Sequence, residues 1–167
     1  AWSVRSGQAG AELGPVTGAG DVNGDGFDDL LIGDPTDPST NPASSGMGRV
    51  LLYLGSASSL SPVPDWTLLS ARPGEILASS IAGVGDLNHD GFDDLLVGGT
   101  ATYSDRERGC AYGFLGSPHG LEQNPHWSVC YFGGAGVNAL GDVNNDGFDD
   151  VSVTIVSSLG QSETRAF

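Results

Sequence analysis

Lysine is absent from this sequence, and six arginines are the whole basic complement against 21 acidic residues. The formal net charge is −15 at pH 7. A surface of that sign repels the phosphate backbone of nucleic acids and the head groups of anionic membranes. We therefore expect no nucleic-acid partner.

Long apolar runs are missing as well. No stretch of 18 or more apolar residues is present, although a membrane-spanning helix needs about that length. Residues 1–10 also lack the basic region followed by an apolar run that marks a secretion signal. We therefore expect no insertion into a membrane, and localisation has to be inferred from other features.

Cysteine is scarce, since Cys110 and Cys130 are the two in the chain. Two cysteines are too few for a disulfide framework, and neither belongs to a CxxC motif or a Cys/His cluster with metal spacing. They lie symmetrically about a turn near Gly120, so a cross-strand disulfide is geometrically plausible, and two buried free thiols are the alternative. A disulfide would favour an oxidising compartment.

Glycine and proline are abundant, with 27 and nine residues, whereas 16% of the chain is charged. Such a composition indicates many turns and disfavours long helices. A chain of 167 residues is long enough to bury a substantial core. We therefore predict a single domain, residues 1–167, of the all-β class.

An internal repeat decides the expected architecture, because self-similarity at a fixed spacing is the signature of repeat folds. A segment of 13 residues recurs at starts 65 and then 56 residues apart, as DVNGDGFDDLLIG from Asp21, DLNHDGFDDLLVG from Asp86 and DVNNDGFDDVSVT from Asp142. A tryptophan that opens a short strand-like run recurs once per repeat, at Trp2, Trp66 and Trp127. We expect these tryptophans to pack in a core.

Each repeat contains short apolar runs bounded by Gly, Pro, Asp and Ser, which is the pattern of four short strands. In the first repeat these are residues 13–19, 29–32, 49–54 and 66–69. Units of about this size with four strands each are typical of β-propeller blades. We therefore predict about three four-stranded antiparallel blades in approximate units 11–70, 74–131, and 132–167 plus 1–10.

The third unit combines both ends of the chain, because residues 1–10 contain a last strand and residues 132–167 contain three earlier ones. The N-terminal strand is therefore expected to complete the last blade. Three blades fall short of the four to eight that usually close a ring. The alternatives are that the chain is part of a larger propeller, or that a second copy completes the ring as a homo-oligomer.

The acidic residues are concentrated in the repeated loops, which hold 12 of the 16 aspartates. Calcium takes six to eight hard oxygen ligands, and a short loop supplies them when alternate residues turn inward. Counting from the first aspartate, the side chains at positions 1, 3, 5 and 9 and the carbonyl at position 7 are the expected ligands, while a glycine at position 6 permits the sharp turn. The predicted metal ligands are Asp21, Asn23, Asp25, Phe27 and Asp29, then Asp86, Asn88, Asp90, Phe92 and Asp94, and then Asp142, Asn144, Asp146, Phe148 and Asp150.

Other interpretations of these loops are weaker. An EF-hand shares the opening pattern but needs a bidentate Glu at position 12, where this chain has Ile32, Val97 and Val153. Magnesium demands a tighter octahedron and retains its waters. Acidic turns that bind nothing are disfavoured because convergent carboxylates repel one another without a cation. We therefore expect three Ca²⁺ sites.

Several residues invite a different role. The aspartates at loop position 8, Asp28, Asp93 and Asp149, are expected to point away from the ion, since neighbours on an extended segment face opposite sides. His89 is expected to be a solvated loop residue. The sequence contains no nucleophile elbow, phosphate-binding loop or zinc-protease motif. We therefore predict no catalytic residues and no enzyme activity.

These loops resemble the FG-GAP repeats of the integrin α-subunit β-propeller and its bacterial relatives, and we expect a bacterial source. The resemblance is most specific in the DxNxDGFDD segments. It implies that each loop joins the first two strands of a blade and holds calcium on one rim of the propeller. It also implies that a ligand binds to the opposite face.

The expected function is a calcium-binding β-propeller module of a secreted or surface protein, in which structural calcium supports a scaffold for adhesion or ligand binding. Extracellular placement also agrees with the calcium concentrations that weak sites require. The partner would be an unknown protein or glycan. The alternative is an accessory module of an extracellular enzyme, of the polysaccharide lyase or phospholipase type, whose active site lies outside this chain.

Overall fold

In the computed structural model, residues 2–5, 13–36, 48–72, 75–101, 108–156 and 162–166 are described. Within these ranges the regular structure consists of β-strands, and no helix suitable for crossing a membrane is found. The strands are β1 (Val16–Gly20), β2 (Asp29–Asp34), β3 (Arg49–Tyr53), β4 (Trp66–Leu69), β5 (Glu75–Gly83), β6 (Leu95–Ala101), β7 (Arg108–Phe114), β8 (Trp127–Phe132), β9 (Ala135–Gly141), β10 (Asp150–Val156) and β11 (Ser162–Ala166).

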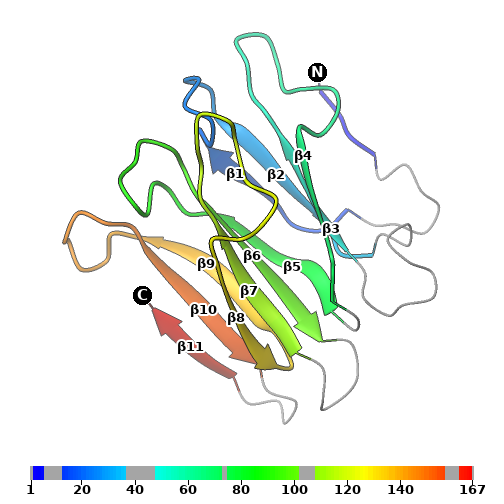
Figure 1. Cartoon of the computed structure of the whole chain (residues 1–167), viewed down its shortest axis with the longest axis vertical. Helices are drawn as coiled ribbons and strands as arrows, with labels where there is room; N and C mark the ends of the chain where they lie inside the picture. The colour runs from blue at the N-terminus through cyan, green and yellow to red at the C-terminus, as the bar shows by residue number, and fades with distance from the viewer. Residues whose placement is uncertain are drawn as a thin grey trace.

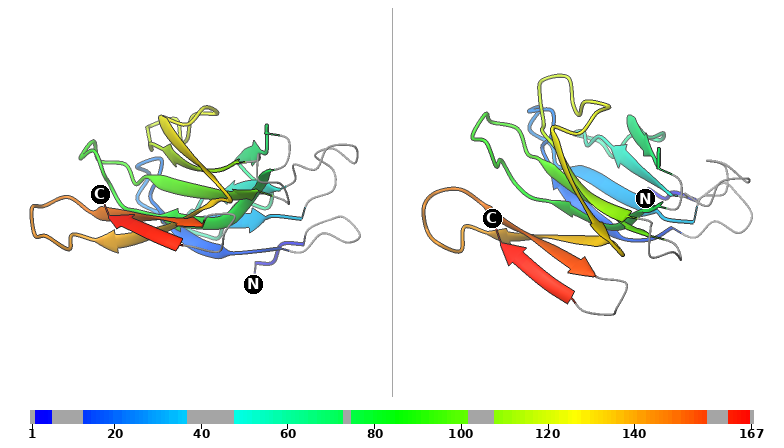
Figure 2. Two further views of the ribbon diagram at one scale, coloured as in Figure 1. Left: turned by 90° about the horizontal axis from the view of Figure 1, so that it is seen from below. Right: turned by 60° about the horizontal axis from the view of Figure 1, so that its bottom comes forward.

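The strands form three antiparallel sheets in which each strand pairs with its neighbour along the chain (Figure 1). Blade 1 contains β1 to β4, blade 2 contains β5 to β8, and blade 3 contains β9 to β11. β5 contacts β1 and β2 on one side and β9 on the other, so the first strands of the blades lie next to one another. Figure 2 shows the sheets from two further sides. The predicted all-β fold of propeller blades is confirmed.

β6 explains how the blades pack, because both of its faces are buried. Leu95 and Val97 belong to the core between blades 1 and 2, whereas Leu96 belongs to the core between blades 2 and 3 with Val137 and Val153. Alternate side chains of a strand face opposite sides of its sheet. A strand covered on both faces is therefore continuously apolar, as Leu95 to Val97 are.

Residues 2–5 are not part of the described blade 3 sheet, which has the order β11-β10-β9, and residues 6–10 lie outside the described part of the chain. Completion of the last blade by the N-terminal strand therefore stays a prediction. The indole of Trp2 packs edge-on against Tyr53 of blade 1, with ring centroids 5.0 Å apart, and its Nε1 donates to the Ser61 carbonyl at 2.9 Å. Trp66 packs on Phe114 of blade 2 in the same way, at 5.2 Å. The tryptophan of one unit therefore packs against the following blade. Figure 1 places the N-terminus and β11 at opposite ends of the molecule.

The two cysteines form a disulfide. Cys110 on β7 and Cys130 on β8 are directly opposite each other in the antiparallel register, with Cα atoms 4.0 Å apart. Of the two alternatives that the sequence allowed, a cross-strand disulfide and two free thiols, the structure contains the disulfide.

Candidate metal centres

The three predicted loops occupy the same place in each blade. Residues 21–28, 84–94 and 142–149 join the first strand of a blade to its second strand. Figure 1 shows the loops in a row along one edge of the molecule. The topology thus brings each predicted set of side chains into one loop and keeps the three sets separate.

The backbone of the loops depends on left-handed residues at two fixed positions. Position 6 is glycine in every loop, with φ between 88° and 94° at Gly26, Gly91 and Gly147. Position 4 is also left-handed, at Gly24, His89 and Asn145. Glycine and asparagine tolerate this conformation well, and histidine does so more readily than most side chains.

Within each loop the side-chain oxygens of positions 1 and 3 turn toward the same backbone amide. In the first loop, Asp21 Oδ1 and Asn23 Oδ1 both accept from the N–H of Asp25, at 3.0 and 3.1 Å. Asp21 Oδ2 accepts from Gly26, and Asp25 Oδ1 accepts from Phe27. The same four bonds recur in the second and third loops. Alternate polar side chains therefore face inward.

The aspartate at position 9 accepts from the start of its own loop and from the segment after the third strand of the blade. Asp29 is 3% exposed, and its two oxygens accept from the N–H groups of Val22 at 3.0 Å and Gly55 at 2.8 Å. Asp94 makes the equivalent bonds to Leu87 and Gly116, both at 2.9 Å. Each carboxylate thus ties its loop to the blade.

Burial raises the pKa of Asp29 to about 6, although the two backbone hydrogen bonds oppose this shift. The neighbouring carboxylates of Asp25 and Asp21 raise the pKa further. The pKa of Asp94 is raised for the same reasons, with burial as the largest cause. A negative charge is therefore disfavoured at Asp29 and Asp94 until a cation balances it.

The donor chemistry of each loop fits calcium, because three carboxylates and one amide oxygen are hard oxygen ligands. Across the described ranges, however, no three His, Cys, Asp or Glu side chains converge in a group able to hold a metal. In the first loop, the side-chain Nδ2 of Asn23 donates to Asp25 Oδ2 at 3.0 Å, and both oxygens of Asp21 accept from backbone amides. The third carboxylate is held by backbone amides. The ligand assignments, including the carbonyls at position 7, therefore remain predictions.

His89 has a role that its sequence position did not reveal. Its ring stacks on Phe148 of the neighbouring loop, with centroids 4.2 Å apart and planes inclined by 25°. Its Nδ1 lies 3.1 Å from the Asp86 carbonyl. One sequence feature could have indicated this contact: every loop has a phenylalanine at position 7, while the residue at position 4 varies between loops.

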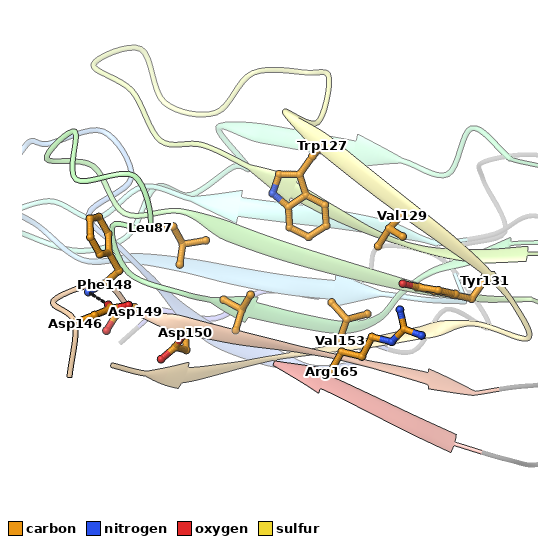
Figure 3. Close-up of a pocket in the computed structure, with 11 residues that line it drawn as sticks. Leu87, Trp127, Val129, Tyr131, Asp146, Phe148, Asp149, Asp150, Val153 and Arg165 are labelled. Carbon is orange, nitrogen blue, oxygen red and sulfur yellow. Dashed lines mark hydrogen bonds between the residues drawn. The ribbon is translucent and has the colours of Figure 1, made fainter. Parts of the chain in front are cut away.

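A cavity of about 630 Å³ lies between β8 of blade 2 and the strands of blade 3 (Figure 3). Its walls are mainly apolar, with aspartates at one end and Arg165 at the other: they comprise Leu87, Trp127, Val129, Tyr131, Asp146, Phe148, Asp149, Asp150, Val151, Val153 and Arg165. Between blades 1 and 2 the corresponding tryptophan, Trp66, is covered by Phe114.

Comparison with known proteins supports the resemblance. The model of the FG-GAP-like repeat matches residues 21–97, which contain the first two loops. Integrin alpha-5 of Xenopus laevis is 30% identical over 171 aligned positions, covering 96% of this chain and 16% of the integrin. Integrin alpha-8 of Mus musculus is 31% identical over 158 positions, covering 88% of this chain and 14% of the integrin.

A third relative is integrin alpha-PS5 of Drosophila melanogaster, 29% identical over 157 positions that cover 87% of this chain and 15% of the integrin. The chain therefore spans about one-sixth or less of the length of these relatives. Its three blades and repeated DxNxDGFDD loops agree with the family match. The chain belongs to the FG-GAP repeat family, and its repeats are similar to those of integrin α subunits.

Proposed function

We propose that this chain is a calcium-stabilised FG-GAP β-propeller module that serves as a scaffold for adhesion or ligand binding. The observation that carries the calcium proposal is the identical set of hydrogen bonds in three loops with the same oxygen donors. The raised pKa of Asp29 supports it, since the neighbouring charges that raise the pKa of this buried carboxylate, those of Asp25 and Asp21, are both negative. The position 1, 3, 5 and 9 side chains and the position 7 carbonyl would hold each ion.

The proposed role of calcium is structural. A cation that binds the folded loops and not the unfolded chain stabilises the fold by about 2.7 kcal/mol per site at a hundredfold excess over its dissociation constant. Asp29 and Asp94 connect their loops to the segment just after the third strand of the blade, through the N–H groups of Gly55 and Gly116. An ion that orders a loop would therefore also stabilise the blade to which that loop belongs.

Calcium stoichiometry tests this proposal directly. Equilibrium dialysis should find three ions bound per chain, and Asp25→Ala, Asp90→Ala and Asp146→Ala should each remove one. Asp65→Ala is the matched control because Asp65 is an exposed aspartate outside the loops. An unchanged stoichiometry in the loop variants, or no bound calcium in the parent protein, would refute the proposal.

The ligand of the scaffold is proposed to be a protein or a glycan, bound on the face opposite the calcium edge. The connections on that side are not repeated in sequence, and residues 37–47, 102–107 and 157–161 lie outside the described part of the chain. We propose binding without catalysis. A protein and glycan array probed with and without calcium tests both the ligand class and the dependence on the loops.

We also propose an extracellular location, which the Cys110–Cys130 disulfide supports because disulfides persist in oxidising compartments. β11 lies at the edge of its sheet. The proposed assembly is therefore a larger propeller, formed with further blades of a longer chain or with another copy. The mass of the purified chain in solution distinguishes self-assembly, which gives a multiple of 17.0 kDa, from a monomer.

A further inference from the structure

We infer that the three loops form one interlocked stack, in which positions 7 and 8 of each loop hold the loop of the preceding blade. The proposed calcium sites are then coupled between blades. This inference rests on the calcium binding proposed above. Its structural basis is a pair of contacts that occurs at both junctions between adjacent loops.

The first contact is made by the aspartate at position 8. Asp93 Oδ2 accepts from the N–H of Asp21 at 2.7 Å, and the N–H of Asp93 donates to the carbonyl of Asp21 at 3.1 Å. Asp21 is the first proposed ligand of loop 1, whereas Asp93 precedes the last proposed ligand of loop 2, Asp94. A movement of either ligand's backbone is therefore transmitted to the other loop.

The same approach is present at the next junction. The carboxylate of Asp149 lies against Gly85, as that of Asp93 lies against Gly20, and a Cβ at either glycine would collide with it. Gly20 and Gly85 have φ of 73° and 71°. The residue before loops 1 and 2 is thus glycine for two reasons, namely the left-handed backbone and the carboxylate of the following blade, whereas Gly141 before loop 3 has the left-handed backbone alone.

The second contact is made by the aromatic ring at position 7. The ring of Phe92 lies over Gly24, and the ring of Phe148 stacks on His89. Gly24 and His89 both occupy position 4 of the preceding loop. Two contacts thus join corresponding positions at each junction, which a chance approach of flexible loops does not explain.

Loop 1 provides an internal control, since none of the described loops lies on the side of loop 1 that would correspond to a preceding blade. Asp28 occupies position 8 and is exposed, and none of the described residues forms a hydrogen bond or ion pair with its side chain. Asp28 and Asp93 therefore have the same place in the motif and the same charge, but they differ in the contact with a preceding loop.

The glycine amides at position 6 offer a site-resolved test, because each donates to the first aspartate of its own loop. Calcium titrations followed by ¹H–¹⁵N spectroscopy would give separate midpoints for Gly26, Gly91 and Gly147. We expect Asp93→Ala to raise the Gly26 midpoint by about fivefold or more, the lower end of typical coupling between sites. Asp28→Ala should leave it within about twofold, and Asp93→Asn should retain most of the affinity because Asn keeps an acceptor oxygen.

Coupling is reciprocal, so a second measurement does not depend on the folding of Asp93→Ala. Asp25→Ala, which removes a proposed ligand of loop 1, should raise the Gly91 midpoint in the otherwise unchanged chain. Equal effects of Asp93→Ala and Asp28→Ala on Gly26, or a Gly91 midpoint insensitive to Asp25→Ala, would overturn the inference. If calcium moved none of the three resonances in the parent protein, the calcium proposal itself would fail.

Discussion

At the start of β5, Glu75 places a carboxylate inside the fold, with 1% of its surface exposed. Its Oε1 accepts from the N–H of Cys110 at 2.9 Å, and its Oε2 accepts from the hydroxyl of Tyr112 at 2.8 Å. Burial raises the pKa of Glu75, while these hydrogen bonds and the charge of Arg72 lower it in part. The folded state therefore favours the protonated form more than the unfolded chain does.

The raised pKa of Glu75 predicts the direction in which the stability of the protein changes with pH. The stabilising contribution of Glu75 is complete below the unfolded pKa of 4.5 and is lost as the pH rises through its higher folded pKa. Glu75→Gln mimics the protonated acid, so it should stabilise the protein at pH 7.5 and have little effect near pH 4. Urea unfolding at both pH values, in chelator, measures the difference.

Exposed Glu122 supplies the matched control, since Glu122→Gln removes the same charge at the surface. Its effect on the free energy of unfolding should be small, and similar at both pH values. A Glu75→Gln effect with no pH dependence, or destabilisation that grows toward pH 7.5, would contradict the interpretation.

Among the strands, the tryptophan contacts determine how firmly one blade is attached to the next. Trp66 on β4 is 6% exposed and packs edge-on against Phe114 on β7. Trp66→Ala removes a buried aromatic ring, for which a loss of about 3 to 5 kcal/mol is typical. Trp127→Ala should cost less, because Trp127 is partly exposed and lines a cavity. Equal losses, measured by urea unfolding in chelator, would contradict this account.

The disulfide adds a covalent constraint between β7 and β8. It closes a loop with a sequence separation of 20 residues, for which the expected stabilisation is about 3 kcal/mol. The double variant Cys110→Ala and Cys130→Ala should therefore unfold at a lower urea concentration than the parent. Adding a reductant to the parent should lower its stability similarly and should not affect the variant, whereas a reductant-sensitive variant would contradict the assignment.

At the scale of elements, the sequence pattern predicted blade 1 well. Residues 29–32 and 66–69 were expected as strands, and β2 and β4 contain them. The first predicted strand began at residue 13, whereas β1 begins at Val16. Gly14 and Gly33 nevertheless bond through their backbones next to this strand, as the N–H of Gly14 donates to the Gly33 carbonyl at 2.8 Å. Apolar periodicity thus locates a strand better than it locates the strand's end.

For the whole molecule, the repeat predicted the blades and the loops because each is specified within one unit of sequence. The packing partner of Trp2 lies 51 positions away, at Tyr53. This contact depends on how neighbouring blades pack against each other. Contacts between loops, such as His89 with Phe148, belong to neighbouring units. Local pattern carries no direct information about such contacts.

Thermal unfolding with and without calcium tests the central claim most directly. If three sites each contribute about 2.7 kcal/mol at a hundredfold excess of calcium, the combined gain of about 8 kcal/mol corresponds to a rise in Tm of roughly 15 °C or more. The rise should be reversed by EDTA, and magnesium at equal concentration should produce less of it. Identical melting curves in calcium and EDTA, with no metal in the purified protein, would contradict the account.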